Sequence, residues 1–418
     1  MFNRTAVLLA ALCMGGLAYG QATAPTAKEA QAPPPSTAPA EATPTDKPDG
    51  VLGDGCAAPD NDPTRWWGSA DYLLGWTRGA RLPPLLTTSP AGTARGSAGV
   101  VGQPNTTVLF GNTEAGADLR SGIRLDLGAW FDREHTWGID AGGFVIESQA
   151  NLFSASSPDG NTILARPFTN ATNNTPVSQL VAFPGLSTGS VTGSYRSDNL
   201  FGANIDLQEV VLACEHFRVE SILGYRFLQL NDRLAMDTSQ TALGGGVVAT
   251  GTQVVVSDRI SASDTFHAGD FGLRAEYCAE RWTLGVLAKL AVGSVHRSVG
   301  ITGATTTTVP GSAPVNSSGG FLALSSNSGV FGSSDWVVAP EFGLNFGWNL
   351  SSSATLRLGY SVLLWSDVAR SVDQIDLAIN PALFPPATAA ATPSRPSFHL
   401  TKSDIWLQAL SLGLEYRY

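Results

Sequence analysis

The stretch Ile405–Tyr418, IWLQALSLGLEYRY, decides the fold. Side chains on a β-strand point alternately to opposite faces. One face of this stretch carries Trp406, Leu410, Leu412, Leu414, Tyr416 and Tyr418, and the other carries Ala409, Ser411, Gly413, Glu415 and Arg417. A strand with one apolar face and one polar face suits the wall of a β-barrel in a bilayer, where lipid touches only the outside. The stretch therefore predicts a membrane barrel.

Segments of about ten residues repeat this alternation along the chain. They are residues 66–76, 122–131, 137–145, 201–207, 217–227, 271–277, 282–292, 336–348 and 356–364. Short connections (131–137, 207–217, 277–282, 348–356) alternate with long ones rich in Gly, Ser, Thr, Asn and Pro (77–121, 147–195, 231–265, 294–335, 366–404). Outer-membrane barrels have short periplasmic turns and long extracellular loops. We therefore predict an all-β, transmembrane, antiparallel up-and-down barrel of about ten strands, or twelve if 253–257 or 295–301 adds to the wall.

Aromatic residues cluster at the ends of these segments. Barrels place aromatic girdles at both membrane interfaces, and ten residues at about 3.3 Å each, tilted by about 40°, rise roughly 25 Å. Trp66 and Trp76 are ten residues apart, so we expect them in opposite girdles. The full predicted girdle is Trp66, Trp76, Trp137, Trp282, Trp336, Trp348, Trp406, Tyr416 and Tyr418. A water-soluble sandwich would not explain the alternating loop lengths.

Composition and the N-terminal region agree with a secreted membrane protein. Only 14% of residues are charged, against about 25% in soluble proteins. The net charge of −10 argues against a nucleic-acid partner. Residues 1–20 fit a cleaved signal peptide, and the Ala/Pro-rich residues 21–64 fit a disordered periplasmic linker before the barrel at 65–418. Among Cys56, Cys214 and Cys278, one disulfide is expected, with the pair Cys214 and Cys278 slightly favoured.

Several stretches resemble a known family. They are Trp66–Pro90, Gly99–Gly111, Leu164–Phe168, Ile222–Asp232, Ala339–Trp348 and Tyr360–Asp376. They are similar to the putative beta barrel porin-7 family of bacterial outer-membrane proteins, over about residues 65–418. The resemblance implies an outer-membrane barrel and carries no catalytic or ligand-binding residues. Tyr418 departs from the terminal Phe frequent in such barrels but keeps the aromatic end.

Charged residues on the predicted inner faces are the candidate functional residues. The predicted lumen lining is Asp71, Arg124, Asp126, Asp140, Asp206, Glu220, Arg226, Arg274, Glu276, Lys289, Glu341, Arg357, Glu415 and Arg417. In a narrow barrel, opposite charges can pair across the lumen and fill it, since an unpaired buried charge is very costly. The alternative is an open lining that selects small solutes.

Two hypotheses for function follow from the barrel. The first is a porin-like channel for passive diffusion of small polar solutes in the bacterial cell outer membrane. The alternative is a plugged barrel that acts as a surface structural or adhesion scaffold through long extracellular loops. Both need no cofactor and no metal, and both expect contact with outer-membrane lipid and with the barrel-assembly machinery through the C-terminal strand. The sequence does not determine the oligomeric state.

Catalysis is not expected. A third, less favoured hypothesis is an outer-membrane hydrolase in which His267 and His296, near Asp264 and Asp270, act as acid and base. The five histidines show no metal-ligand spacing.

Overall fold

The computed structural model describes residues 65–246, 248–387 and 391–418. The expected signal peptide, the linker up to residue 64 and Cys56 lie outside the described residues. Within the three described ranges, no helix is long and apolar enough to cross a bilayer.

The regular secondary structure of the described residues is almost entirely β-strand. Its strands are β1 (Trp66–Thr77), β2 (Ala80–Leu82), β3 (Leu86–Thr88), β4 (Thr107–Phe110), β5 (Thr113–Ala115), β6 (Arg120–Trp130), β7 (Trp137–Ile146), β8 (Gln149–Ser157), β9 (Leu164–Asn170), β10 (Thr175–Ala182), β11 (Ser187–Ser197), β12 (Leu200–Ala213), β13 (Phe217–Ala242), β14 (Gln253–Cys278), β15 (Trp282–Thr308), β16 (Val315–Ser318), β17 (Gly329–Asn349), β18 (Ala354–Ala369), β19 (Ala378–Ile379) and β20 (Lys402–Arg417). Two short 3-10 helices, η1 (Ser371–Gln374) and η2 (Pro381–Leu383), lie between β18 and β20.

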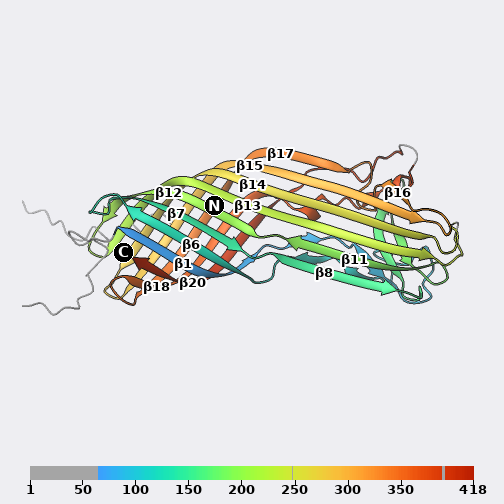
Figure 1. Cartoon of the computed structure of the whole chain (residues 1–418), viewed down its shortest axis with the longest axis horizontal. Helices are drawn as coiled ribbons and strands as arrows, with labels where there is room; N and C mark the ends of the chain where they lie inside the picture. The colour runs from blue at the N-terminus through green and yellow to red at the C-terminus, as the bar shows by residue number, and fades with distance from the viewer. Residues whose placement is uncertain (1–64, 247, 388–390) are drawn as a thin grey trace, which may run out of the picture. The chain divides into compact units, whose positions relative to one another are not determined.

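Ten strands close a ring. The order is β1-β6-β7-β12-β13-β14-β15-β17-β18-β20, and β20 pairs back onto β1 from Trp67↔Arg417 to Thr77↔Leu407. All neighbours in the ring are antiparallel. The β6–β7, β12–β13, β14–β15 and β17–β18 connections are short and share one end of the barrel with the C-terminus (Figure 1). We call the end with these short connections the turn end and the opposite end the loop end. The predicted all-β fold and ten-strand wall are confirmed.

The outer surface of the ring is an apolar belt. On β20, Leu410, Leu412, Leu414 and Tyr416 are exposed, while the alternate residues Ala409 and Ser411 are buried. The same alternation exposes Leu125 and Leu127 on β6 and Leu223 and Tyr225 on β13; on β17 it exposes Val338, Phe342 and Leu344. A row of exposed apolar residues on every second position is what contact with lipid requires of a barrel strand.

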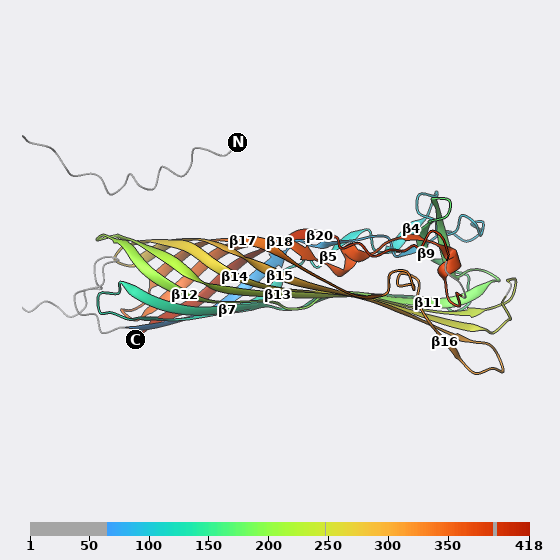
Figure 2. The same ribbon diagram turned by 90° about the horizontal axis from the view of Figure 1, so that it is seen from above.

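Three of the expected long loops are in large part strands, which corrects the prediction for 147–195, 231–265 and 294–335. β13, β14, β15 and β17 continue past the belt, and residues 253–257 and 295–301 are parts of β14 and β15 rather than extra wall strands. β12 pairs with the first half of β13, and β11 with the second half, so β8 and β11 prolong the positions of β7 and β12 (Figure 1; Figure 2 shows β7, β11 and β12 from above). The outer face of this extension carries polar residues such as Ser261 and Thr302 and the exposed ion pair of Asp237 and Arg259.

The inner face of the extension is covered by a second layer. A small sheet, β10-β9-β3-β4 with β19 parallel to β9, packs there together with the segment around Phe321. Leu234 and Met236 of β13, with Ile260 of β14, contribute from the extension, and Leu164 and Phe168 of β9 contribute from the small sheet. The loop end is therefore a two-layered β-structure with its own apolar core.

Cys214 and Cys278 lie at the turn end. Cys278 takes part in a disulfide, and Cys214 is not the other half of it. The slightly favoured pairing of these two residues is therefore wrong. Cys56, the other cysteine of the predicted mature chain, lies outside the described residues.

Candidate functional site in the barrel lumen

Charged side chains from non-adjacent strands meet inside the ring. Arg226 of β13 forms ion pairs with Asp270 of β14 (3.0 Å) and with Glu341 of β17. Since β14 and β15 separate β13 from β17 in the ring, the contact with Glu341 spans the lumen. Lys289 of β15 likewise reaches Asp206 of β12 and is 2.7 Å from Asp270. Asp270 has no exposed surface, so these pairs lie in a packed interior.

The second group of pairs lies nearer the turn end. Arg274 of β14 is 3.0 Å from Glu220 and 3.9 Å from Asp140 of β7, and its Nη1 also donates to Gln208 at 3.0 Å. Arg357 is 3.5 Å from Glu415. Opposite charges thus cross-link the lumen in more than one layer.

The remaining predicted lining residues lie on the same inward-facing positions. Arg124 is 4.0 Å from Glu341, and Ser69 donates to Asp126 at 3.3 Å. Asp71 is buried, and Glu276 is half-buried. Arg417 donates to Glu415 at 2.9 Å, but its side chain is 55% exposed, so it lies at the rim. A role of any of these groups in selecting solutes stays a prediction.

Two charged residues of this network were absent from the predicted lining. Asp270 accepts from both Arg226 and Lys289, and Arg218 forms a 2.8 Å ion pair with Glu220. Both lie at inward-facing positions of their strands, so the alternation of side chains that selected their neighbours also identifies them.

A second apolar cluster lies inside the ring toward the loop end, and the sequence did not reveal it. We call it the mouth core. Its members come from every wall strand except β6, and they are Leu73, Ile146, Leu200, Leu228, Leu230, Phe266, Ala268, Ala291, Val295, Val337, Ala339, Leu363, Trp365, Val368, Ile405 and Leu407. Phe266 and Trp365 pack with ring centroids 5.9 Å apart, and they are 0% and 1% exposed. Inward side chains of strands that are not neighbours in the ring are therefore in contact.

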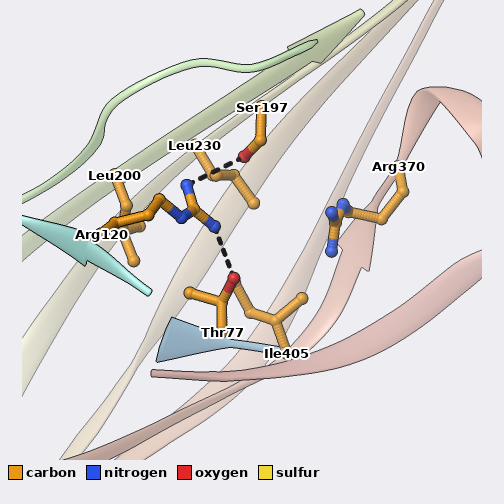
Figure 3. Close-up of a pocket in the computed structure, with 7 residues that line it drawn as sticks. All are labelled: Thr77, Arg120, Ser197, Leu200, Leu230, Arg370 and Ile405. Atoms are coloured by element: carbon orange, nitrogen blue, oxygen red, sulfur yellow. Dashed lines mark hydrogen bonds between the residues drawn. The ribbon is translucent and has the colours of Figure 1, made fainter. Parts of the chain in front are cut away.

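A strap, residues 370–374, follows β18 and lies beside the mouth core residues Leu230 and Ile405 (Figure 3). The backbone N–H of Ser371 donates to Asp232 of β13 at 2.6 Å, and Arg370 Nε donates to the same carboxylate at 2.7 Å. The Tyr195 hydroxyl accepts from Arg370 Nη2 at 2.6 Å and donates to Asp232 at 3.1 Å. Burial raises the pKa of Tyr195, and the Asp232 carboxylate acts in the same direction. These fully buried contacts fix the strap to the wall.

A further buried ion pair fastens the two layers of the loop end. Asp258 Oδ1 accepts from the backbone N–H groups of Phe321, Leu322 and Ala323 at 2.8, 2.8 and 3.0 Å. Asp258 Oδ2 accepts from Arg166 Nη1 at 2.9 Å, and the Arg166 guanidinium lies 4.1 Å from the centre of the Phe321 ring. Burial lowers the pKa of Arg166, although Asp258 opposes this.

The predicted girdle residues occupy both ends of the belt. Trp66, Trp137, Trp348, Tyr416 and Tyr418 are exposed near the turn end, where Trp282 pairs in register with Trp348. Trp336 is exposed toward the loop end, and Trp76 and Trp406 are half-buried there. Trp66 and Trp76 thus lie at opposite ends of β1.

The histidine site proposed for a hydrolase is not assembled, and that prediction is wrong. His267 and His296 lie on the outer face, where they hydrogen-bond to Tyr225 (2.6 Å) and Ser334 (3.0 Å). Asp264 and Asp270 are buried on the inner face. Strand alternation therefore separates the two residue types by the thickness of the wall.

Comparison with known proteins identifies a family. The model of the putative beta barrel porin-7 family matches residues 67–418. No curated protein matches the chain. Among solved structures, the outer membrane protease OmpT from Escherichia coli is 10% identical with a TM-score of 0.41, covering 84% of this chain and 97% of that one. A Pseudomonas aeruginosa FadL homologue is 8% identical with a TM-score of 0.22, covering 87% and 96%. The P. putida toluene transporter TodX is 8% identical with a TM-score of 0.22, covering 84% and 89%. At these values, no activity is transferred from the solved structures. The family match spans most of the sequence, and the chain belongs to the putative beta barrel porin-7 family.

Proposed function

We propose that this protein is a closed barrel of the bacterial outer membrane that anchors and displays the two-layered β-structure of its loop end outside the cell. The apolar belt supports contact with outer-membrane lipid. The short connections support a periplasmic turn end, because outer-membrane barrels carry short turns on that side and their longer loops outside.

The observation that carries the proposal is the mouth core. Apolar side chains from nine of the ten wall strands form one buried cluster, in which Phe266 and Trp365 are 0% and 1% exposed. Below this layer, Arg226 and Lys289 are held by carboxylates of other strands. A solute would have to separate both layers, and leaving a buried charge without its partner is strongly unfavourable.

Display of the loop end is tested by labelling intact cells. Thr302→Cys places a thiol on the exposed outer face of β15, and Ser351→Cys places one in an exposed turn between β17 and β18. A membrane-impermeant maleimide should label the first variant above the parent protein and leave the second at the parent level. Labelling of Ser351→Cys without labelling of Thr302→Cys would reverse the orientation and refute the proposal.

A diffusion channel for small polar solutes is the second candidate. The family description as a porin and the charged residues of both signs in the lumen favour it. Proteoliposomes separate the two candidates, because a channel admits small sugars and amino acids and makes the vesicles swell. A closed barrel leaves the swelling rate at that of empty vesicles.

Recognition of β20 by the barrel-assembly machinery is retained as part of the proposal. β20 pairs with β1 and β18 and completes the ring, and its outward residues keep the alternating aromatic end. Replacing the outward Leu412 with Asp should block membrane insertion, whereas replacing the exposed loop-end residue Arg81 with Asp should not. Equal insertion of both variants would exclude this role for β20.

A further inference from the structure

The extension of the wall at the loop end is an open sheet with two margins. Its strand order is β8-β11-β13-β14-β15-β17, so β8 forms one margin and β17 forms the other (Figure 1). Among the described residues, β8 pairs only with β11, and residues 329–340 of β17 pair only with β15. A sheet margin with unpaired backbone groups is a template for a further strand. The extension therefore has two places at which a strand can be added.

Pro340 explains where the open margin of β17 begins. The pairing of β17 with β18 ends at Glu341↔Leu363, while β18 continues beside β20. Proline has no backbone N–H to donate to a neighbouring strand, so it stands at strand margins and ends ladders. The margin is thus written into the sequence of β17.

The unpaired backbone groups of this margin belong to outward-facing residues. In an antiparallel sheet, the N–H and C=O of one residue point to the same neighbouring strand, and those of the next residue point to the opposite one. The Val338 carbonyl accepts from Ser366 Oγ of β18 at 2.9 Å, so every second residue before Val338 faces the margin. These residues are Val330, Gly332, Ser334 and Trp336, and all four are exposed.

The inner side of the β17 margin is covered by the chain itself. The ring of Phe331 stacks on that of Phe398 with centroids 3.8 Å apart, and Asp335 forms a 2.6 Å ion pair with Lys402. These two residues alternate with the outward-facing ones. The contacts therefore occupy the inner face of the strand and leave its outward-facing residues exposed.

β8 presents its outward-facing residues to the other margin. β8 runs away from the turn end and β17 runs toward it. Reversing the direction of a strand also reverses the side to which its outward-facing residues direct their backbone groups, so those of β8 point away from β11. They are Ala150, Leu152, Ser154 and Ser156, and all four are exposed. At the start of β8, Gln149 donates to Asp118, so the open stretch follows that residue.

The large apolar side chains with the greatest exposure among the described residues lie on these two margins. Leu152 of β8 and Val330 and Trp336 of β17 are each 78% exposed, and Leu127 of the belt follows with 63%. Leu152 and Val330 lie beyond the belt, among outward-facing Ser and Gly residues. Removing such side chains from water favours association.

A second copy of this chain offers a strand of the right direction to each margin. Copies in one membrane share one orientation, so β8 of one copy and β17 of the copy beside it run in opposite directions. We propose that the β8 margin of one protomer pairs with the β17 margin of the next as an antiparallel ladder. Ser154 opposite Ser334 aligns the middle of both open stretches and places Leu152 against Trp336.

This pairing joins neighbouring extensions into one continuous sheet. The two margins are different surfaces, so each protomer keeps one margin for a further copy and the contact produces rows or rings. A peptide from another protein would fill one margin and leave the other open. The pairing requires a common orientation in the membrane and goes beyond the proposed function, since it is the same for a closed and for a conducting lumen.

Disulfide crosslinking in membranes tests the pairing. Residues exchanging hydrogen bonds across an antiparallel ladder have Cα atoms about 5.5 Å apart, within reach of a disulfide. Cells that express a Ser154→Cys copy and a differently tagged Ser334→Cys copy should form, after mild oxidation, a dimer that carries both tags. A copy with both substitutions should form a ladder of dimers, trimers and longer species. Ser154→Cys with Thr302→Cys, which lies on β15 in the middle of the sheet, should stay at the level of the parent protein.

Three results would overturn the proposal. The first is a mixed-tag dimer no more abundant than with Thr302→Cys. The second is a dimer of Ser334→Cys alone without the mixed-tag dimer, because two β17 margins would then meet. The third is a crosslink of Ser334→Cys to another protein in place of the mixed-tag dimer.

A proline in the margin provides an independent test. Gly332→Pro, added to the Ser334→Cys copy, removes an N–H of the margin and none of the β15–β17 ladder, as Pro340 does at its own position. A Cβ at Gly332 would meet only the Arg297 carbonyl, at 3.8 Å. The variant should migrate as folded on unheated gels, and its mixed-tag dimer should fall to the level of the Thr302→Cys control. Undiminished crosslinking of the folded variant would contradict the ladder.

Discussion

The buried pair of Asp258 and Arg166 makes a quantitative prediction about the loop end. Asp258→Asn removes the negative charge but keeps the shape of the side chain. The amide oxygen can still accept from the backbone N–H groups of Phe321, Leu322 and Ala323. The guanidinium of Arg166, which is 1% exposed, loses its ion-pair partner and faces an amide instead.

The expected cost follows from burial. Removing one partner of a buried ion pair destabilises a protein by about 3–5 kcal/mol, because the other charge stays buried. The pair of Asp237 on β13 and Arg259 on β14 is the control, since its side chains are 41% and 49% exposed. Exposed pairs contribute about 0–1 kcal/mol. Asp258→Asn should therefore increase local opening by at least about 100-fold, and Asp237→Asn by less than about tenfold.

Hydrogen–deuterium exchange of the protein in detergent measures this opening. The peptide that covers 319–328 should exchange faster in Asp258→Asn, because Asp258 holds its backbone N–H groups. A peptide from β20, in the barrel wall, should exchange as in the wild type. The reasoning is refuted if the 319–328 peptide of Asp258→Asn exchanges no faster than that of Asp237→Asn.

Three further perturbations probe the barrel. Lys289→Met leaves the buried carboxylates of Asp206 and Asp270 without their shared cation and should destabilise the barrel by about 3–5 kcal/mol in urea unfolding followed by tryptophan fluorescence; an unchanged midpoint would contradict the charge network. Gly224→Ala should impair folding in the same assay, because a Cβ there would lie 2.3 Å from the Ile205 carbonyl; wild-type stability would show that the wall can yield. Desolvation raises the pKa of Asp132, but hydrogen bonds from the backbone N–H groups of Trp137 and Thr136 together outweigh it and lower that pKa from 3.8. The stabilisation by ionised Asp132 is therefore present above about pH 4 and is lost as pH falls through the folded pKa. Asp132→Ala should lose stability at pH 7 but not at pH 2, and an equal loss at both would exclude the ionised turn.

The wall could be predicted from sequence because lipid imposes a strict local pattern. Each wall strand must expose apolar side chains on every second residue, as Leu410, Leu412 and Leu414 do. The inward charges follow by parity, so residues such as Arg226 and Glu341 were placed on the inner face of the barrel from their own strands alone.

The mouth core was missed because its residues occupy the same inward-facing positions as the charged residues of the lumen but are apolar. On β13, the inward positions change from the charged Arg226 to the apolar Leu228 and Leu230 within one step of the alternation. Above the belt, the outward positions carry small polar residues such as Ser261 and Thr302, whose composition resembles that of a loop. Apolar residues at inward-facing positions just beyond the lipid belt are the sequence pattern that would have predicted this layer.

The strap was unpredictable for another reason. Asp232 and Arg370 are 138 residues apart. No local periodicity relates them, and their pairing depends on how a loop after β18 folds over a wall made of other strands.

Conductance of the purified protein in planar bilayers is the most direct test of the central claim, that packed side chains close the lumen. We expect that protein that migrates as folded on unheated gels and is incorporated into the bilayer gives no current steps at either polarity. A conducting porin measured in the same bilayers serves as the positive control. Stable unitary steps from the wild-type protein in salt solution would contradict the claim.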